Sequence, residues 1–460
     1  MKSVNPDRSP LVSRMSSTAA LSAALVFAIS PGTVHASESG YDYAVLLTSG
    51  DPVAGGDTFG TGFETWSFND RGQLAFDVGL VPSGAVGVFR YDRGRVQEIV
   101  RSGQPAPGGG AFVFPTTMSM NQSGDVAFTE VLTPTGSLPR GVNWGVYAYS
   151  PRTGAVRAVL APGVSQAPNG SIFRGAYYHD DINDSGAVSF SGIFPTPDGI
   201  VGNPSHLGTG MFRADPDGAI TAIATPGDLA PGGGKFDFVY NTTINDRGDA
   251  AFGGHIASEE CIDNPTDPTL IHCTTGVYLK RSGGPVVTIA HPGDPAPRGG
   301  IFRQASGANI NSSGNVAFNG DLTPAPAINA DNGVFLYLAP FGRTIALARP
   351  GDAMPGGGTL LTIRFDFNSR VINSLSQVAF RGFLDSVTNG TNDQGAWVWS
   401  FGVLRLVART GMIIPGLGKI AALVDPLAFS PLALNDLGQV AFRAKLDDGR
   451  VVVLLATPHS

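Results

Sequence analysis

Short apolar runs, each bounded by turn-forming residues, recur along the chain between Tyr41 and Ala456. Runs such as 126–132 are largely apolar and only as long as a strand, and glycine, asparagine, aspartate or serine precedes them. Paired runs such as 87–100 and 145–160 carry glycine near their middle, which is typical of β-hairpins. The pattern predicts an all-β chain of many short strands, and the largely apolar runs indicate burial on both faces.

One polar motif precedes an apolar run seven times. In its common form it reads Asn-x-x-Gly-x-x-Ala-Phe, as in LNDLGQVAF at 434–442. Asparagine starts a tight turn by bonding its side chain to its own backbone, and glycine supplies the left-handed conformation that closes a short hairpin. We therefore interpret the seven asparagines as structural turn residues: Asn69, Asn121, Asn183, Asn245, Asn311, Asn373 and Asn435.

The spacing of these asparagines is nearly constant, at 52, 62, 62, 66, 62 and 62 residues. A long fixed period indicates a repeat architecture. In one copy the turn contains Arg247, Gly248 and Asp249, the triplet of adhesion proteins, but the other six copies lack it. We expect this triplet to be part of a turn and not an adhesion signal.

A second motif, GDPAPGGG or a variant of it, stands at a steady distance from each turn. Its aspartates could form a ring of cation ligands, because hard cations prefer several convergent carboxylates. Alternatively, each aspartate caps its own turn. Three copies carry glutamine, valine or methionine instead, which favours capping at the four aspartates: Asp51, Asp228, Asp294 and Asp352.

Each unit has room for about four strands, and seven such units of about 60 residues predict a β-propeller with four-stranded antiparallel blades. A parallel β-helix is the alternative, but its coils are shorter and need no hairpin turns. The last unit lacks a fourth strand, and residues 41–56 match the missing strand together with its loop. We expect this N-terminal strand to join the last blade and close a seven-bladed ring.

The first 36 residues have the pattern of a signal peptide. Three basic residues precede a short apolar run at 16–30, and small residues stand at Val34 and Ala36. The run is too short for a membrane span. We expect a bacterial protein that is secreted or periplasmic, with residues 37–460 forming one propeller domain.

Two cysteines occur, Cys261 and Cys273. In an exported protein such a pair is expected to form one disulfide that closes a local loop. A metal site would need further ligands, and only His255 and His272 are near in sequence. We expect neither a metal nor another cofactor.

Composition narrows the function classes. Glycine and proline number 62 and 34 of 460 residues, too many for a helical protein. The net charge is −7, so the chain has no excess of basic residues that would bind phosphate groups, and nucleic acid is not an expected partner. The chain also lacks GxSxG, HExxH and GxxxxGK[ST] motifs. We expect a monomer.

The chain resembles the bacterial secreted proteins built from tandem NxxGxxAF repeats. The resemblance covers nearly all of the expected mature chain and rests on motifs repeated six or seven times. It implies a repeat fold and no established reaction, and it carries over no catalytic residues. Proteins of this kind have varied C-terminal anchors, and we expect none here, because the apolar run at 451–456 has only the length of a strand.

In a propeller the innermost strand of each blade lines the central channel. Polar residues on these strands form our candidate site at the channel mouth. Strand alternation would place His179 and Asp181 on one face, where they could act as a base, a ligand or a hydrogen-bonded pair. The alternative is a channel merely edged with polar side chains. The candidate residues are Glu64, Tyr178, His179, Asp181, Asn241 and Arg370.

Two functions remain open. The first is a binding module for an extracellular protein or glycan, with no catalysis, and we expect its ligand on the long variable loops opposite the NxxG turns. The second is an extracellular hydrolase or lyase for saccharide or lactone substrates. Convergence of Glu64, His179, Asp181 and Arg370 in one small pocket would favour the enzyme.

Overall fold

A computed structural model describes residues 40–133, 142–195, 207–257, 261–263, 271–323, 332–364, 370–388, 391–423 and 432–459. The chain divides into two units, Met1–Val34 and His35–Ser460, and every described residue belongs to the second. Across these ranges the secondary structure consists of 32 strands, and no helix is long and apolar enough to cross a membrane.

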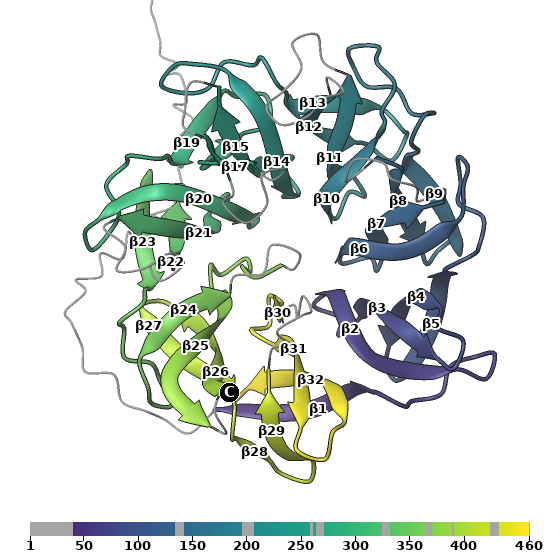
Figure 1. The fold of residues 1–460 in the computed structure, drawn as a ribbon, viewed down its shortest axis with the longest axis vertical. Coiled ribbons are helices and arrows are strands. Elements are labelled where there is room, and N and C mark those ends of the chain that lie inside the picture. The colour runs from purple at the N-terminus through teal and green to yellow at the C-terminus, as the bar shows by residue number, and fades with distance from the viewer. Residues whose placement is uncertain are drawn as a thin grey trace, which may run out of the picture. The chain divides into compact units, whose positions relative to one another are not determined.

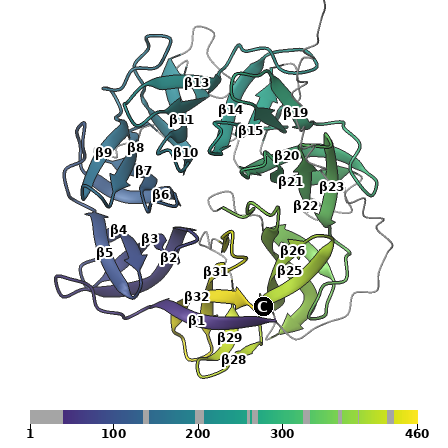
Figure 2. The same cartoon turned by 180° about the vertical axis from the view of Figure 1, so that it is seen from behind.

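Seven antiparallel sheets stand around a common axis, so the predicted propeller is confirmed (Figures 1 and 2). Blades one to three, each given from the axis outwards, are β2 (Thr58–Phe68), β3 (Leu74–Val81), β4 (Val86–Asp92) and β5 (Arg95–Arg101); β6 (Phe112–Met120), β7 (Val126–Leu132), β8 (Trp144–Ser150) and β9 (Ala155–Leu160); and β10 (Gly175–Ile182), β11 (Val188–Pro195), β12 (Leu207–Ala214) and β13 (Ile220–Ala224).

Blades four to six follow the same order and are β14 (Phe236–Ile244), β15 (Ala250–Ile256), β18 (Gly276–Lys280) and β19 (Val286–Ala290); β20 (Ile301–Ile310), β21 (Val316–Thr323), β22 (Asn332–Leu338) and β23 (Arg343–Ala348); and β24 (Leu360–Arg364), β25 (Val378–Thr388), β26 (Thr391–Ser400) and β27 (Val403–Arg409). A separate two-stranded sheet pairs β16 (Cys261–Asp263) with β17 (Ile271–Cys273).

The seventh blade is built from both ends of the chain. Strand β1 (Tyr41–Thr48) pairs antiparallel with β32 (Val451–Pro458), which confirms the predicted closure. Strand β32 pairs with β31 (Val440–Leu446), whose inner edge meets two short strands, β29 (Gly418–Ala422) and β30 (Leu432–Leu434). Strand β28 (Ile413–Ile414) pairs with β29.

The repeated aromatic positions form the core of each blade. In blade one, Phe59, Phe76 and Phe89 come from three neighbouring strands, and their ring centroids lie 5.4–5.5 Å apart. All three side chains are buried. Edge-to-face and offset contacts of this kind stabilise a core beyond the burial of apolar area. Blades two to five repeat the cluster, with Phe112, Phe128 and Tyr147; Phe173, Phe190 and Phe212; Phe236, Phe252 and Tyr278; and Phe302, Phe318 and Phe335.

The NxxG turns have the geometry that their sequence predicts. Asn245 Oδ1 accepts the backbone N–H groups of Arg247 and Asp249, both at 3.0 Å, and Gly248 has a φ of +79°. Asp249 is buried, and it also accepts the N–H of Ser282 at 3.0 Å. The Arg-Gly-Asp triplet is therefore one copy of the turn, with its carboxylate held inside the protein.

Replacing Gly248 by valine should lower the free energy of unfolding by about 1–3 kcal/mol, because a β-branched residue is strained at positive φ. Equilibrium urea unfolding measures the change. Gly79→Val is the matched control, since Gly79 lies within β3 and an added Cβ there meets no atom within 4 Å. Equal effects at the two positions would contradict this account of the turn.

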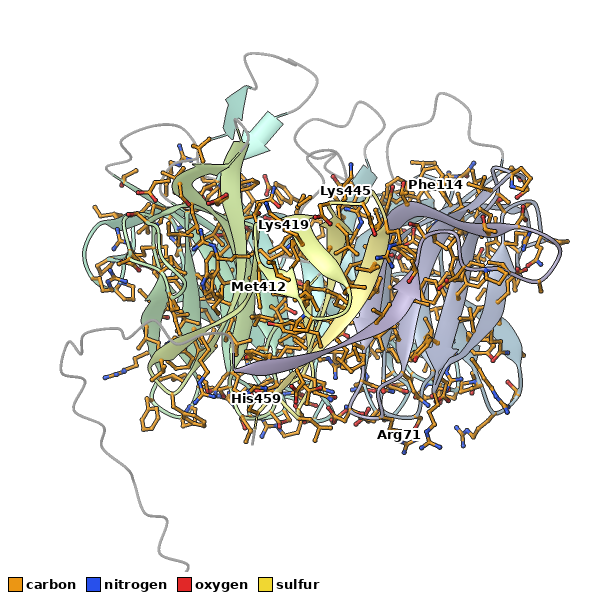
Figure 3. The ribbon with its side chains drawn as sticks, turned by 90° about the horizontal axis from the view of Figure 1, so that it is seen from below. Arg71, Phe114, Met412, Lys419, Lys445 and His459 are labelled. Atoms are coloured by element: carbon orange, nitrogen blue, oxygen red, sulfur yellow. The ribbon has the colours of Figure 1, made fainter. Side chains whose placement is uncertain are left out.

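The aspartates of the GDPAPGGG loops cap their own turns, as expected. Each accepts the backbone N–H of the residue three positions earlier, at 2.7–2.9 Å. In the second copy the amide oxygen of Gln104 accepts the N–H of Arg101 in the same way. These loops and the NxxG turns lie at opposite ends of the strands. We call the end with the NxxG turns the turn face; in Figure 3 it carries Arg71 and His459, and Phe114 lies toward the other face.

The predicted disulfide would join Cys261 and Cys273, whose side chains are not among those that the structure describes. The backbones of Cys261 and Cys273 are register partners in the β16–β17 pair. Most of the long loops that follow β11, β15 and β21 also lie outside the described ranges, so the prediction that they carry the ligand stays a prediction.

Candidate binding site at the axis of the turn face

The seven motif asparagines form one closed ring of hydrogen bonds around the axis. Each Nδ2 donates to the backbone carbonyl of the asparagine in the next blade, at 2.9–3.3 Å. The last bond runs from Asn435 to Asn69, between residues 366 positions apart, and closes the circle. All seven side chains are buried. Because Oδ1 holds the turn of its own blade, a single side chain fixes both the turn and the contact between blades.

The residue after each asparagine contributes to a second circle, nearer to solvent. The N–H of Asp184 donates to Asp246 Oδ1 at 2.7 Å, and the N–H of Asp436 donates to Asp70 Oδ1 at the same distance. Three further bonds of this kind are present at 2.7–3.1 Å. The side chains of the second circle are therefore held in place by neighbouring blades. Its members are Asp70, Gln122, Asp184, Asp246, Ser312, Ser374 and Asp436.

These seven residues line a cavity of about 180 Å³, which we call the axial cavity. Arg370 also lines it, together with Ile244 and Ile310 from the ends of two inner strands and Ile372 from the segment after β24. Four carboxyl groups thus share the lining with one guanidinium. The isoleucines add apolar surface.

Arg370 reaches from blade six toward blade three. Its Nη2 lies 3.4 Å from the carbonyl oxygen of Ile182 and 3.6 Å from Asp181 Oδ1. Burial lowers the pKa of Arg370, but the carboxylates around it outweigh this effect and raise the pKa on balance. Arg370 therefore stays charged and neutralises part of the acidic surface.

The pKa values of the carboxyl groups of Asp181 and Asp70 are raised as well, but here burial is the main cause. Burial raises the pKa of Asp181, against the lowering effect of Arg370. Burial also raises the pKa of Asp70, and the nearby charges of Asp436 and Asp184 act in the same direction. Crowded carboxyl groups favour a ligand that brings positive charge or hydrogen-bond donors.

The structure brings together two of the six residues predicted to form the site, Asp181 and Arg370. Asp181 has a structural partner as well, because its Oδ2 accepts the N–H of Ile244 at 2.9 Å. Ser67 and Thr243 stand at the same position of other blades and accept the equivalent N–H groups at 3.0 Å. Asp181 therefore joins two blades.

The other candidates are not gathered at the cavity. Glu64 lies on β2 with its side chain exposed, and it does not line the axial cavity. Asn241 is buried on β14, with a φ of +56°, at a register shift between Tyr240 and Thr243. Tyr178 and His179 belong to β10, but their side chains lie outside the described ones.

Sequence reasoning missed the second circle because it treated the turn face as purely structural. The available signal was the residue after each asparagine, which is aspartate in four of the seven copies. A buried pair was also missed: His255 Nδ1 lies 2.6 Å from Asp237 Oδ1 on blade four, and the imidazole stacks on Phe238 at 5.3 Å.

Carboxyl, amide, hydroxyl and guanidinium groups line the axial cavity. Its described residues include no histidine or cysteine, and its hydroxyl groups belong to Ser312 and Ser374. Among the side chains described, no three His, Cys, Asp or Glu groups are placed to hold a metal ion. The arrangement offers charge, hydrogen bonds and a little apolar surface.

Strand pairing and the axial cavity define the class: a seven-bladed β-propeller with a polar cavity on its axis. Within that class, the chain belongs to a family of unknown function (DUF7453), whose model matches residues 18–359 and 268–452. No curated protein matches the sequence.

Solved propellers share the general arrangement at low identity. The β-propeller domain of the Trilobed protease from Pyrococcus furiosus is 9% identical, with 86% of this chain and 94% of that chain covered and a TM-score of 0.47. PorZ, a surface component of the type-IX secretion system of Porphyromonas gingivalis, is 14% identical, with 87% and 48% covered and a TM-score of 0.45. The GH74 xyloglucanase from Xanthomonas campestris is 12% identical, with 91% and 53% covered and a TM-score of 0.43. Similarity at this level does not indicate a shared function.

Proposed function

We propose that the protein is an exported binding module, without a reaction of its own, that holds an extracellular protein or glycan at the axial cavity. The observation that carries the proposal is the lining of this cavity by one residue from each of the seven blades, four of them aspartate. Bonds between neighbouring blades fix several of these side chains before a ligand arrives. Such pre-organisation reduces the entropy that binding would cost.

The contacts of Asp181 count against a hydrolase or lyase at the channel mouth. A general base must reach a proton of its substrate, whereas both oxygens of Asp181 face groups of the protein. His255 and Asp237 resemble a catalytic pair in spacing, but they are only 1% and 9% exposed. We therefore favour binding.

Export and a monomeric state are parts of the same proposal. The leader pattern of the first 36 residues supports a secreted or periplasmic location. A ring that one chain completes with its own two end strands needs no second copy for closure, which supports a monomer.

The double variant Asp184→Asn/Asp246→Asn tests the cavity. Asparagine keeps the Oδ1 that accepts the N–H of Gln122 or of Asp184, so the variant should fold while losing two charges. We expect the best ligand from a panel of basic, neutral and acidic oligosaccharides and peptides to bind this variant about tenfold more weakly. Isothermal titration calorimetry measures the loss.

Asp217→Asn is the matched control. Asp217 is exposed at the tip between β12 and β13, and it likewise accepts one backbone N–H, from Ala219 at 3.0 Å. If no ligand of the panel distinguishes the double variant from this control, the cavity is not the binding site.

A further inference from the structure

Large apolar side chains are exposed on the turn face, and four of them stand in the turns and hairpin tips of blades five to seven. Phe341 and Phe401 stand at the tips of the outer hairpins of blades five and six, and each is 71% exposed. Leu375 and Leu437 stand in the NxxG turns of blades six and seven and are 53% and 60% exposed. We call these four side chains the apolar patch. Exposed apolar groups gathered in one region of a surface mark a site of interaction.

Hydrogen bonds connect the segments that carry the patch in blades five and six. The N–H of Ala339, two residues before Phe341, donates to Asn315 Oδ1 at 2.8 Å. Asn315 Nδ2 in turn donates at 2.8 Å to the hydroxyl of Ser376, which follows Leu375. The tip of blade five therefore adjoins the turn of blade six.

The same turn contacts the remaining two segments. Gln377 Nε2 donates at 3.0 Å to the hydroxyl of Ser400, which precedes Phe401. The N–H of Ser374 donates to Asp436 Oδ1 at 2.7 Å. Ser374 and Asp436 line the axial cavity, and each is followed directly by a leucine of the patch. The apolar patch therefore begins at the rim of the cavity and extends outward over two blades.

Exposed apolar residues in the turns and hairpin tips are confined to one side of the ring, although Val96 on the outer strand of blade one is also 42% exposed. At the same turn position, blades one to five carry arginine or serine, and the described hairpin tips of blades one to four have no large apolar residue. A feature required by the fold would appear in every blade, so the patch reflects something other than blade packing. The residues that replace the leucines are Arg71, Ser123, Ser185, Arg247 and Ser313, and the charged tips include Arg93, Arg152 and Asp217.

We propose that the turn face docks a segment of a partner protein in which one lysine or arginine is flanked by apolar residues. This inference rests on the proposed function and names the ligand class for the same cavity. The basic side chain enters the axial cavity, where its charged end meets four carboxyl groups that outnumber the one guanidinium of Arg370, and its alkyl stem meets the isoleucines. The flanking residues lie on the apolar patch.

The chemistry of the surface favours a protein segment over a glycan. Leucine and isoleucine side chains offer no hydrogen bonds to sugar hydroxyl groups, and they stand at the rim and in the lining of the cavity. An acidic cavity beside an apolar patch is complementary to a cation beside apolar side chains. The carboxylates would attract the cation, and the patch would supply contact area.

A pool of short fluorescent peptides tests the inference. Each peptide has a central lysine and two residues on either side drawn from leucine, isoleucine and phenylalanine. One matched pool replaces the lysine by norleucine, and another replaces the apolar residues by serine. We expect the first pool to bind the wild-type chain, and either replacement to weaken binding by about tenfold or more, as measured by fluorescence anisotropy.

Variants of the chain separate this inference from the proposed function. The double variant Phe341→Ser/Phe401→Ser should bind the first pool about tenfold more weakly than the wild type does. The double variant Asp184→Asn/Asp246→Asn should show a similar loss of binding. Phe114→Ser is the control, because Phe114 is 45% exposed and lies toward the opposite face (Figure 3). Thermal unfolding of each variant checks that it remains folded.

The outcomes are distinct. If the cavity variant loses binding while Phe341→Ser/Phe401→Ser binds as the wild type does, the cavity stands as a site and the docking inference is wrong. If no peptide binds but a basic or neutral oligosaccharide does so at the cavity, the ligand is a glycan and the docking inference is wrong. If peptides bind and neither variant differs from Phe114→Ser, both the inference and the proposed site are wrong.

Discussion

Replacing Asn121 by alanine should lower the free energy of unfolding by about 3 kcal/mol or more. Asn121 is fully buried, and its Oδ1 accepts the N–H groups of Ser123 and Asp125 at 3.0 and 2.9 Å. Its Nδ2 donates to the carbonyl of Asn183 at 3.1 Å. Alanine removes all three hydrogen bonds, and each bond of this kind contributes about 1 kcal/mol, although the carbonyl of Asn183 keeps the N–H of Gly186 at 2.9 Å. Equilibrium urea unfolding measures the difference.

Asn169→Ala provides the matched control. Asn169 lies in an exposed loop and accepts one backbone N–H, from Ser171 at 3.0 Å, so its loss should cost less than about 1 kcal/mol. Similar losses for the two variants would show that the asparagine ring contributes no more than an ordinary turn. A large loss for Asn121→Ala alone would identify the ring as a main link between blades.

The free energy of unfolding should fall by about 3 kcal/mol between pH 5 and pH 8 because of one carboxyl group, that of Asp77. Burial raises the pKa of Asp77 to about 7, although the N–H and hydroxyl of Thr65 donate to it at 2.6 and 2.8 Å. Glu64 nearby adds to the rise. In the unfolded chain this carboxyl group loses its proton near pH 4, and each unit of difference corresponds to about 1.4 kcal/mol.

The sign follows from proton binding. Between pH 4 and pH 7 the folded chain holds a proton on Asp77 that the unfolded chain has released, so raising the pH favours unfolding. Glu130 on the neighbouring blade acts in the same direction, since burial raises its pKa well above the usual value and the charge of Asp77 adds to this. One of its oxygens is buried with no hydrogen-bond partner among the described residues.

Asp77→Asn isolates the effect. The amide oxygen can still accept from Thr65, while the titrating group is gone, so the pH dependence should become shallower by about 3 kcal/mol over the same range. Urea unfolding at pH 5 and pH 8 gives the comparison, with the exposed Asp217→Asn as control. If Asp77→Asn keeps the full pH dependence of the wild type, Asp77 is ionised in the folded chain.

The sequence predicted the fold because the signals that define it are local and repeated. Asn245, Gly248 and Phe252 recur in almost every blade with the same spacing, and each acts within its own turn or strand. The similarity of residues 41–56 to the GDPAPGGG unit also predicted how the ring closes. The capping role of Asp51 followed from turn chemistry alone.

The site was harder to predict because it depends on contacts between distant residues. Arg370 meets Ile182 across 188 positions, and nothing in the sequence links these two residues to each other. The expected alternation of His179 and Asp181 assumed a regular strand, but the register of β10 shifts between Tyr177 and Asp180. Here three steps along β10 stand opposite one step along β11, so regular alternation cannot be assumed across the shift. The burial of Asp77 inside a strand likewise cannot be read from composition.

The pairing of β1 with β32 also constrains the order in which the structure can assemble. Tyr41 meets Pro458, so the outermost strand of blade seven has no partner until more than 400 further residues have left the ribosome. Blades one to six can fold from hairpins between neighbouring strands. The final contact joins the most distant parts of the chain, so it is correspondingly slow to form. The asparagine circle, whose last bond joins Asn435 to Asn69, can then close only as a concluding event. If the chain passes through a narrow translocation pore, it would therefore pass through unfolded, and the propeller ring would close only afterwards.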